Sequence, residues 1–169
     1  MRYIWDLVKH FWLSNSRHGT HSPFVYKLAD QAIYRPYAVP DNAVAFPEQP
    51  PVRYVDMLRR ILIVMGIARI ERWTPGSGAP AIWCDLLTAS AEELLLCVRR
   101  GSVVVVHEPM KSRAVRRKWQ VLVSDPDVVV SINLFHFGVI LHREGQRKEH
   151  FLLRYPYWQR NPDGRRRGN

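Results

Sequence analysis

The sequence predicts an α/β fold, in which a mostly parallel sheet of about five strands carries a C-terminal antiparallel hairpin and an N-terminal helical extension. Between residues 68 and 128, short apolar runs typical of strands alternate with amphipathic runs typical of helices. Residues 103–106 are four consecutive valines, a pattern typical of a strand covered on both faces. Residues 128–134 and Phe137–Leu141 are two further strand candidates, and the short link between them favours antiparallel pairing.

The N-terminal extension, residues 1–34, is predicted to be a pair of helices. Within residues 3–13 the apolar side chains recur at helical spacing: Ile4, Leu7, Val8, Phe11 and Trp12. Ser22 and Pro23 are suited to the N-cap and first position of a second helix that ends near residue 33. Five prolines between residues 34 and 51 predict that residues 35–51 form a semi-rigid connector.

The α/β domain is expected over residues 52–155. Its first helix, residues 52–65, is predicted to present three arginines outward, Arg53, Arg59 and Arg60. A strand is expected over residues 68–73, followed by the turn-rich sequence TPGSGAP at residues 74–80.

The next strand is predicted over residues 81–87, because this run is almost entirely apolar. Ser90 and Glu93 have the spacing of a capping box for a helix that Gly101 ends. A helix is predicted from residue 111 to residue 123, with four side chains packing inward: Ala114, Val115, Trp119 and Leu122. The apolar stretch HFLLRY follows the hairpin, and residues 156–169 are expected to form a mobile basic tail.

Length and composition favour one globular domain. The chain has 169 residues, 47% of them hydrophobic and 24% charged. The longest apolar run, residues 61–68, is far shorter than the roughly 18 residues of a membrane-spanning helix. The N-terminus lacks the pattern of a signal peptide, and two cysteines in apolar runs are no disulfide framework, so we expect a cytoplasmic protein.

Two turns are candidates for a site. Gly76 and Gly78 in residues 74–80 suit a loop that lets a nucleotide approach the backbone, although Pro-Gly sequences are also ordinary turns. His107 and Glu108 directly follow the valine strand, at the edge of the sheet where α/β proteins bind ligands. They are candidates for proton transfer, and the alternative is a polar turn that ends a buried strand.

A metal site is not expected. His18 and His21 are three residues apart, but a closed zinc site needs four ligands and no neighbouring residue completes the set. Cys84 lies inside an apolar run, where a thiol stays protonated and unreactive.

Positive charge is the main feature of the composition. The net charge is +10, and 20 of the 25 basic residues are arginines, which suit phosphate and carboxylate binding. Two groups of cations are candidates for anion or nucleic-acid contacts: Lys111, Arg113, Arg116, Arg117 and Lys118 in one helix, and Arg165, Arg166 and Arg167 in the tail. A solvated outer face is the alternative interpretation.

Three segments resemble a group of bacterial class I S-adenosylmethionine-dependent methyltransferases. The N-terminal segment RHGTHSPFVYKLADQAIY resembles the family's helical pair with a His-Ser-Pro-Phe motif. The segment GSVVVVHEP and the C-terminal FGVILHREGQRKEHFLLRY resemble its fifth strand and its final hairpin with a Lys-Glu-His-Phe signature. The resemblance covers about two thirds of the chain and implies a Rossmann-like fold and S-adenosylmethionine as cofactor.

The middle of the chain departs from this family. The family carries a glycine loop after strand one, an acid at the end of strand two for the ribose, and a third strand that flanks the adenine. Only a short segment separates residue 73 from the strand at residues 81–87, which resembles strand four, so there is no room for strands two and three. Glu71 stands near the place of a strand-one acid, and with Gly76 and Gly78 it is a candidate cofactor contact. A truncated Rossmann-like sheet and no bound cofactor are therefore expected.

Four functions remain open. The first is a catalytically inactive methyltransferase-like binding or scaffold module, in which the connector or a second subunit covers the sheet edge left by the missing strands. The second is a residual S-adenosylmethionine-dependent methyltransferase completed by a partner chain, with residues 74–80 beside His107 and Glu108 in one pocket. The third is an RNA-binding or ribosome-associated basic module. The fourth is a peripheral membrane protein that uses Trp5, Phe11 and Trp12.

Overall fold

The structure, a computed structural model, describes residues 2–14, 22–35, 37–47 and 53–156. It confirms an α/β fold with a central six-stranded sheet. The strands are β1 (Glu71–Arg72), β2 (Ala81–Cys84), β3 (Val103–His107), β4 (Val130–Asn133), β5 (Phe137–Leu141) and β6 (Glu149–Leu152). The helices are α1 (Arg2–Leu13), α2 (Pro23–Leu28) continued by the π-helical turn η2 (Ala29–Ile33), α3 (Val55–Val64), α4 (Ala91–Arg99) and α5 (Arg113–Ser124).

The sheet is mixed, with the strand order β1-β2-β3-β5-β4-β6. β1, β2 and β3 are mutually parallel, β5 is antiparallel to both β3 and β4, and β6 is parallel to β4. The expected antiparallel hairpin is therefore present. Its second strand, β5, lies between β3 and β4, so the hairpin extends the sheet rather than folding back over it.

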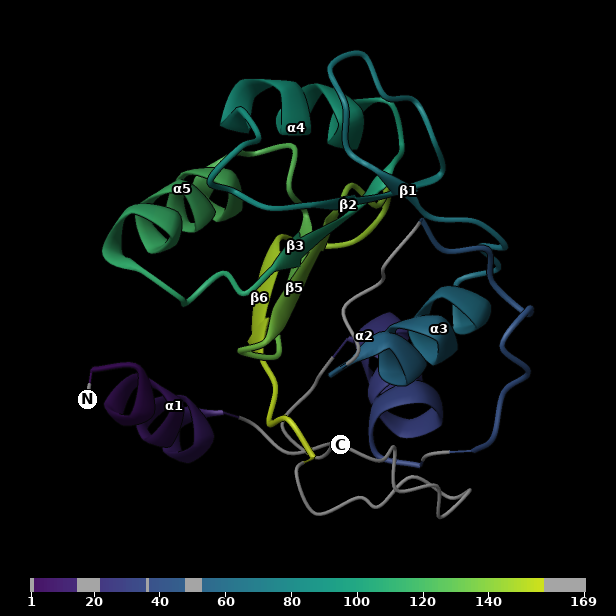
Figure 1. The fold of residues 1–169 in the computed structure, drawn as a ribbon, viewed down its shortest axis with the longest axis horizontal. Coiled ribbons are helices and arrows are strands. Elements are labelled where there is room, and N and C mark those ends of the chain that lie inside the picture. Colours follow the sequence, from purple (N-terminus) through teal and green to yellow (C-terminus); the bar gives the residue numbers. More distant parts are fainter. Residues whose placement is uncertain (1, 15–21, 36, 48–52, 157–169) are drawn as a thin grey trace.

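Helices cover both faces of the sheet. α2, η2 and α3 lie on one side, and α4 and α5 lie on the other (Figure 1). The valines of β3 divide between the two cores: Val103 and Val105 pack with α2, η2 and α3, whereas Val104 and Val106 pack with α4 and α5. The prediction that this run forms a strand buried on both faces is confirmed.

Gly138 lets α5 approach the sheet closely. A Cβ atom at this position of β5 would lie 2.4 Å from Cη2 of Trp119, whose ring packs directly over the strand. Trp119 is buried, as the helical periodicity predicts, together with Val115 and Leu122. Ala114, expected to face inward with them, is exposed.

The expected strand over residues 68–73 is shorter than predicted. Only Glu71–Arg72 pairs with β2, and the residues before it pair with the connector instead. Ala45 donates its N–H to the carbonyl of Ala68 at 2.9 Å and accepts the N–H of Ile70 at 2.9 Å. The connector thus forms a parallel bridge along the edge that the sequence predicted to need a cover.

The expected count of about five strands is corrected to six, and the expected mostly parallel sheet is confirmed, because only β5 runs against the other strands. The extra strand, β6, comes from the apolar stretch after the hairpin. The side chains of β6 do not alternate regularly between buried and exposed, so its sequence does not show the two-residue period of a strand. The hydrogen bonds to β4 define β6 as a strand.

Two of the three arginines predicted to face outward from α3 are buried. Arg59 is 7% exposed, bonds Asp56 at 2.9 Å and lies over the ring of Phe46. Arg60 is 6% exposed and donates to the carbonyl of Ala32 at 2.9 Å. Their long apolar stems pack on the core while their guanidinium groups reach polar partners, which periodicity alone does not reveal.

The capping box predicted at α4 does not form. Ser90 occupies the N-cap in an extended conformation, but its side chain makes no capping hydrogen bond. The end of the helix agrees with the prediction, because Gly101 adopts a φ of 89° just beyond it. No helix in the described parts of the chain is long and apolar enough to cross a membrane.

Candidate functional site

The two residues predicted as catalytic candidates lie at the carboxyl edge of the parallel strands. His107 ends β3, Glu108 follows it, and Asp85 follows the end of the neighbouring β2. Ligands of open α/β sheets bind beyond this edge, so the sequence placed the two candidates at the position where a site would form.

Tyr54, at the N-cap of α3, packs on the face of the sheet next to this edge and is only 2% exposed. Its ring stacks on Phe137 of β5 with ring centroids 4.5 Å apart. Its hydroxyl oxygen lies 2.7 Å from Nδ1 of His107 and 3.1 Å from Nε1 of Trp83. The ring therefore packs on the face of the sheet that α3 covers, against side chains near the carboxyl ends of β2 and β3.

The hydroxyl of Tyr54 links Trp83 to His107. The indole N–H of Trp83 can only donate, so the hydroxyl oxygen accepts it, and the same hydroxyl shares a hydrogen bond with Nδ1 of His107. The other ring nitrogen of His107, Nε2, lies 3.9 Å from a carboxylate oxygen of Glu108. The imidazole is therefore held in place by a phenol on one side and faces a carboxylate on the other.

Burial sets the ionisation of these groups. It lowers the pKa of His107, although the neighbouring Glu108 and Asp85 carboxylates partly oppose this, and it raises the pKa of Tyr54. Burial also disfavours the ionised form of Asp85, but the hydrogen bond from Lys111 and the N–H of Leu87 outweigh it and lower the pKa of this carboxyl. The edge therefore holds neutral imidazole and phenol groups beside an ion pair in which Nζ of Lys111 lies 2.5 Å from Asp85.

Glu108 has an unusual backbone conformation, with a φ of 40°. Its N–H donates to the carbonyl of His136 at 2.9 Å, and its carbonyl accepts the N–H of Lys111 at 3.0 Å. These two bonds hold the sharp turn that leads from β3 toward α5.

The glycine turn lies at the other end of the sheet. Ser77 accepts a hydrogen bond from the thiol of Cys97 at 3.4 Å, and the carbonyl of Ala79 accepts one from the hydroxyl of Ser102 at 2.7 Å. Both partners precede β3, whereas His107 and Glu108 follow it. Gly76 and Gly78 therefore belong to a segment tied to the amino end of β3, and they share no pocket with His107 and Glu108.

Glu71, the third candidate cofactor contact, lies in β1 and pairs with Arg69 at 3.0 Å on the surface. The candidate cofactor residues are thus not gathered around one space. The resemblance to the methyltransferases implies S-adenosylmethionine at the carboxyl edge, whereas the carbonyls of Ser77 and Ala79 in the glycine turn bond to residues that precede β3.

Three of the five cations predicted for an outer face of α5 have partners within the chain. Lys111 pairs with Asp85, Arg116 pairs with Asp6 of α1 at 2.6 Å, and Lys118 donates to the carbonyl of Leu86 at 2.7 Å. The prediction of a purely solvated face is wrong for these side chains.

Arg113 and Arg117 remain exposed, and no ion pair of theirs is found within the described parts of the chain. The predicted contacts at Arg165, Arg166 and Arg167 lie outside the described residues.

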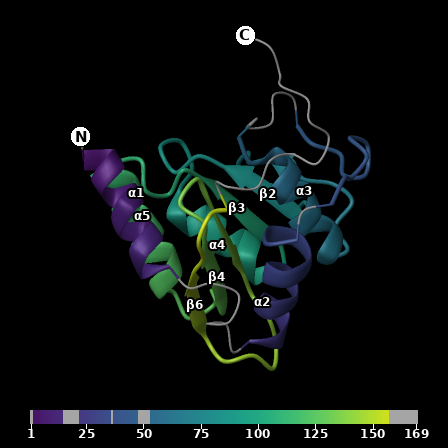
Figure 2. The same cartoon turned by 90° about the horizontal axis from the view of Figure 1, so that it is seen from below.

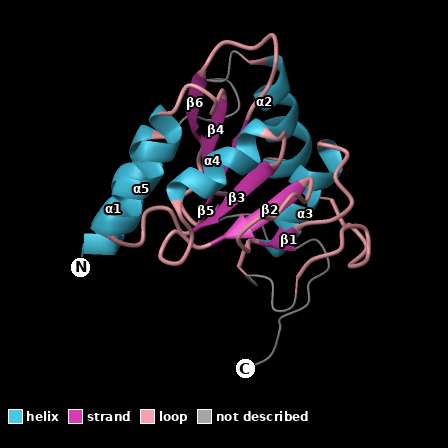
Figure 3. Ribbon diagram, turned by 90° about the horizontal axis from the view of Figure 1, so that it is seen from above, coloured by secondary structure: helices cyan, strands magenta, loops and turns pink. Residues whose placement is uncertain are grey.

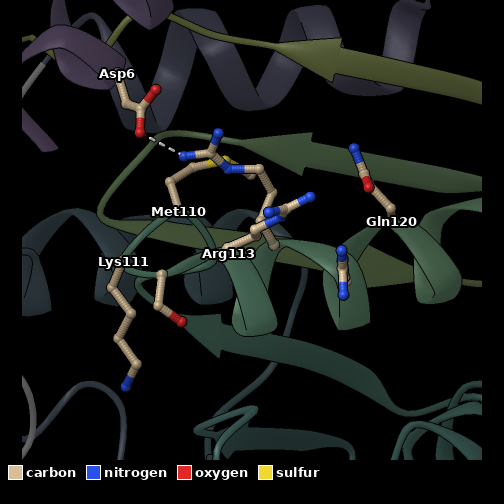
Figure 4. Close-up of a pocket in the computed structure, with 8 residues that line it drawn as sticks. Asp6, Met110, Lys111, Arg113 and Gln120 are labelled. Carbon is tan, nitrogen blue, oxygen red and sulfur yellow. Dashed lines mark hydrogen bonds and ion pairs between the residues drawn. The ribbon is translucent and has the colours of Figure 1, made fainter. Parts of the chain in front are cut away.

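A cavity of about 460 Å³ lies between α1 and α5. Four cationic side chains contribute to its wall, Lys111, Arg113, Arg116 and Arg117, with Asp6 as the acidic one. Figure 4 shows Asp6 reaching from α1 toward an arginine of α5, while Lys111 extends away from it. The cavity joins the predicted cationic residues to α1, which the sequence did not associate with them.

No cluster of potential metal ligands is found among the described residues, and His18 and His21 lie outside them. His10 and His136 are buried, and burial lowers the pKa of each to about 4. Cys84 is buried with its pKa raised, and both cysteines are free thiols.

Three residues at the carboxyl edge were missed by the sequence analysis: Tyr54, Trp83 and Asp85. The strand predicted over residues 81–87 contained Trp83 and Asp85, but β2 ends at Cys84, so the overlong prediction hid that these two residues flank a strand end. Tyr54 had no local signal, because it reaches the edge from a helix 53 residues earlier in the chain.

Comparison of the chain with known proteins finds no matching family model, no matching curated protein and no matching solved structure.

Proposed function

We propose that this chain is a methyltransferase-like binding module that does not use S-adenosylmethionine. The observation that carries the proposal is the edge of the sheet: among the described residues the sheet ends at β1, which is two residues long, with no strand beyond it. On the face that α3 covers, Tyr54 is stacked on Phe137 and hydrogen-bonded to Trp83 and His107, so that face near the carboxyl ends is filled by the chain's own core.

The strand order supports the likeness to the methyltransferases. In a doubly wound sheet with the order 3-2-1-4-5-6, strand one lies beside strand four, and strand four beside strand five. β1, β2 and β3 lie side by side and parallel, as strands one, four and five of such a sheet would. Loss of strands two and three removes the ribose acid and the adenine wall, and the few contacts left would not offset the freedom that a ligand loses on binding.

Calorimetric titration of the full chain with S-adenosylhomocysteine and S-adenosylmethionine tests the proposal. An active class I methyltransferase, titrated with the same ligand solutions, is the positive control. We expect no saturable heat from this chain at ligand concentrations in the millimolar range. One-to-one binding with a micromolar Kd would overturn the proposal.

The alternative of a methyltransferase completed by a partner chain requires residues 74–80 beside His107 and Glu108. The hydrogen bonds of Ser77 and Ala79 keep that turn at the opposite end of β3. A partner would therefore have to supply the glycine loop as well as the missing strands.

Nucleic-acid binding is a second candidate function, favoured by the cationic wall of the cavity between α1 and α5. Arg113 and Arg117 stand one helical turn apart and are exposed. Fluorescence anisotropy with single-stranded RNA at several salt concentrations tests this function. Replacing both arginines by glutamine should weaken binding and make its salt dependence shallower. The negative slope of log K against log salt should shrink in magnitude by about 1.4, at roughly 0.7 for each lost phosphate contact.

The matched control for this experiment is Arg100→Gln, which removes one exposed charge at the end of α4. Binding that is insensitive to salt, or that falls equally in the control and in the double variant, would rule out this surface as a nucleic-acid site.

A further inference from the structure

One side of α1 faces the rest of the protein and includes polar side chains. The Asp6 carboxylate lies 2.6 Å from Arg116 of α5. The ring of His10 is 8% exposed and lies edge-on to Phe135, with ring centroids 5.4 Å apart. Among the side chains that the structure describes, Asp6, the half-buried Leu7 and His10 are the less exposed ones of this helix.

The opposite side of α1 is apolar and exposed. Five residues form what we call the outward face: Ile4 (64% exposed), Trp5 (66%), Val8 (41%), Trp12 (77%) and Leu13 (72%). Ile4, Val8 and Trp12 follow one another at intervals of four, so they form a continuous stripe along the helix. A contiguous exposed patch of this kind marks a surface that contacts another molecule or a membrane.

The charges around the outward face indicate what it contacts. The side chain of Lys9 is exposed beside the stripe, and the acid of this helix, Asp6, is turned away toward Arg116. α1 lies next to α5 at one edge of the molecule (Figures 2 and 3), and α5 carries the exposed Arg113 and Arg117.

This distribution argues against a second copy of the chain. Two copies that met through this face would bring the same cations together, in a protein whose net charge is already +10. An anionic surface has the complementary charge. Tryptophan side chains are also well suited to the boundary between lipid and water, because the ring is apolar and its N–H still finds a polar partner.

We propose that the outward face of α1 inserts into the headgroup region of a bilayer containing anionic phospholipids, with Lys9 and the arginines of α5 facing lipid phosphates. This inference does not depend on the loss of the cofactor, because none of its residues lies at the carboxyl edge of β2 and β3. It fits an interfacial helix, with apolar and aromatic residues on one side and basic residues beside them.

Flotation of the full chain with vesicles tests this proposal, using phosphatidylcholine alone or mixed with phosphatidylglycerol. We expect binding to the mixed vesicles that weakens with salt, and little binding to phosphatidylcholine alone. Replacing Trp5 and Trp12 together by serine should weaken binding by roughly tenfold or more, because the apolar contact is lost. The matched control is Leu87→Ser, an equally exposed apolar residue (60%) in the loop after β2, which should leave binding unchanged.

Failure to bind the mixed vesicles would overturn the proposal, and so would equal binding by the double serine variant. A monomer–dimer equilibrium in sedimentation that the same variant abolishes would show that a second copy covers the face instead. Quenching of the unmodified chain's tryptophan fluorescence by brominated lipids gives a test that needs no variant. The absence of quenching would contradict insertion.

Discussion

The Tyr54→Phe substitution removes one oxygen atom from the centre of the carboxyl-edge group. The indole N–H of Trp83 and Nδ1 of His107 both lose their partner, because each bonds to that oxygen. A typical hydrogen bond contributes about 1 kcal/mol to stability, and a polar group left unpaired in a buried place costs about 1–3 kcal/mol. Since Trp83 and His107 are half-buried and water reaches them in part, we expect the free energy of unfolding to fall by about 1–3 kcal/mol.

Urea unfolding followed by circular dichroism measures this change, and a thermal scan should show Tm lowered by about 2–12 °C for a domain of this size. Tyr26→Phe is the matched control, because the side chain of Tyr26 is 43% exposed and its loss of a hydroxyl should change little. A Tyr54→Phe variant whose stability lies within about 0.5 kcal/mol of the unmodified chain would refute the argument that this hydroxyl ties α3 to the sheet.

Three further changes test other parts of the account. Gly138→Ala places a Cβ 2.4 Å from the ring of Trp119 and should cost about 1–3 kcal/mol in urea unfolding; the cost should shrink in a Trp119→Leu background, and additive effects would contradict the contact. Burial holds the pKa of His136 at about 4, below the 6.5 of the unfolded chain, so the unfolded state takes up the proton first and stability should fall as the pH drops from 6.5 toward 4. His136→Gln should flatten this dependence, and an unchanged slope between pH 7 and pH 5 would contradict it. Lys118→Met removes the hydrogen bonds to the carbonyls of Leu86 and Ala89 and should lower the free energy of unfolding by about 1 kcal/mol, seen as a lower melting temperature. The control Arg117→Met, at an exposed position, should change it by less than about 0.5 kcal/mol. Equal effects of the two substitutions would contradict the role given to Lys118.

The parts of the fold predicted well from the sequence are those with a local signal. The valine strand, the hairpin and the helix with Trp119 each carry a periodicity that is visible within a few residues. β6 and the bridge from Ala45 to residues 68–70 depend on partners far along the chain, and their own sequences do not distinguish them from loops.

The candidate site divides in the same way. The rule that ligands meet the carboxyl ends of parallel strands placed His107 and Glu108 correctly at that edge. It did not reveal that Tyr54 packs against His107, nor that the carbonyl of Ala79 after the glycine turn bonds to Ser102 at the amino end of β3. In α5, the sequence pattern identified a group of cations but not their partners. Only the packed structure shows which of these side chains reach Asp6, Asp85 or a backbone carbonyl.

Calorimetric titration of the full chain with S-adenosylhomocysteine, at low and moderate salt, decides whether the protein has a cofactor site. We expect no saturable heat, because the sheet of the described chain ends at the two-residue β1 and has no strands in the place of those that would hold the ribose and adenine. Saturable one-to-one binding at micromolar concentration would contradict it and would show that this fold retains a cofactor site.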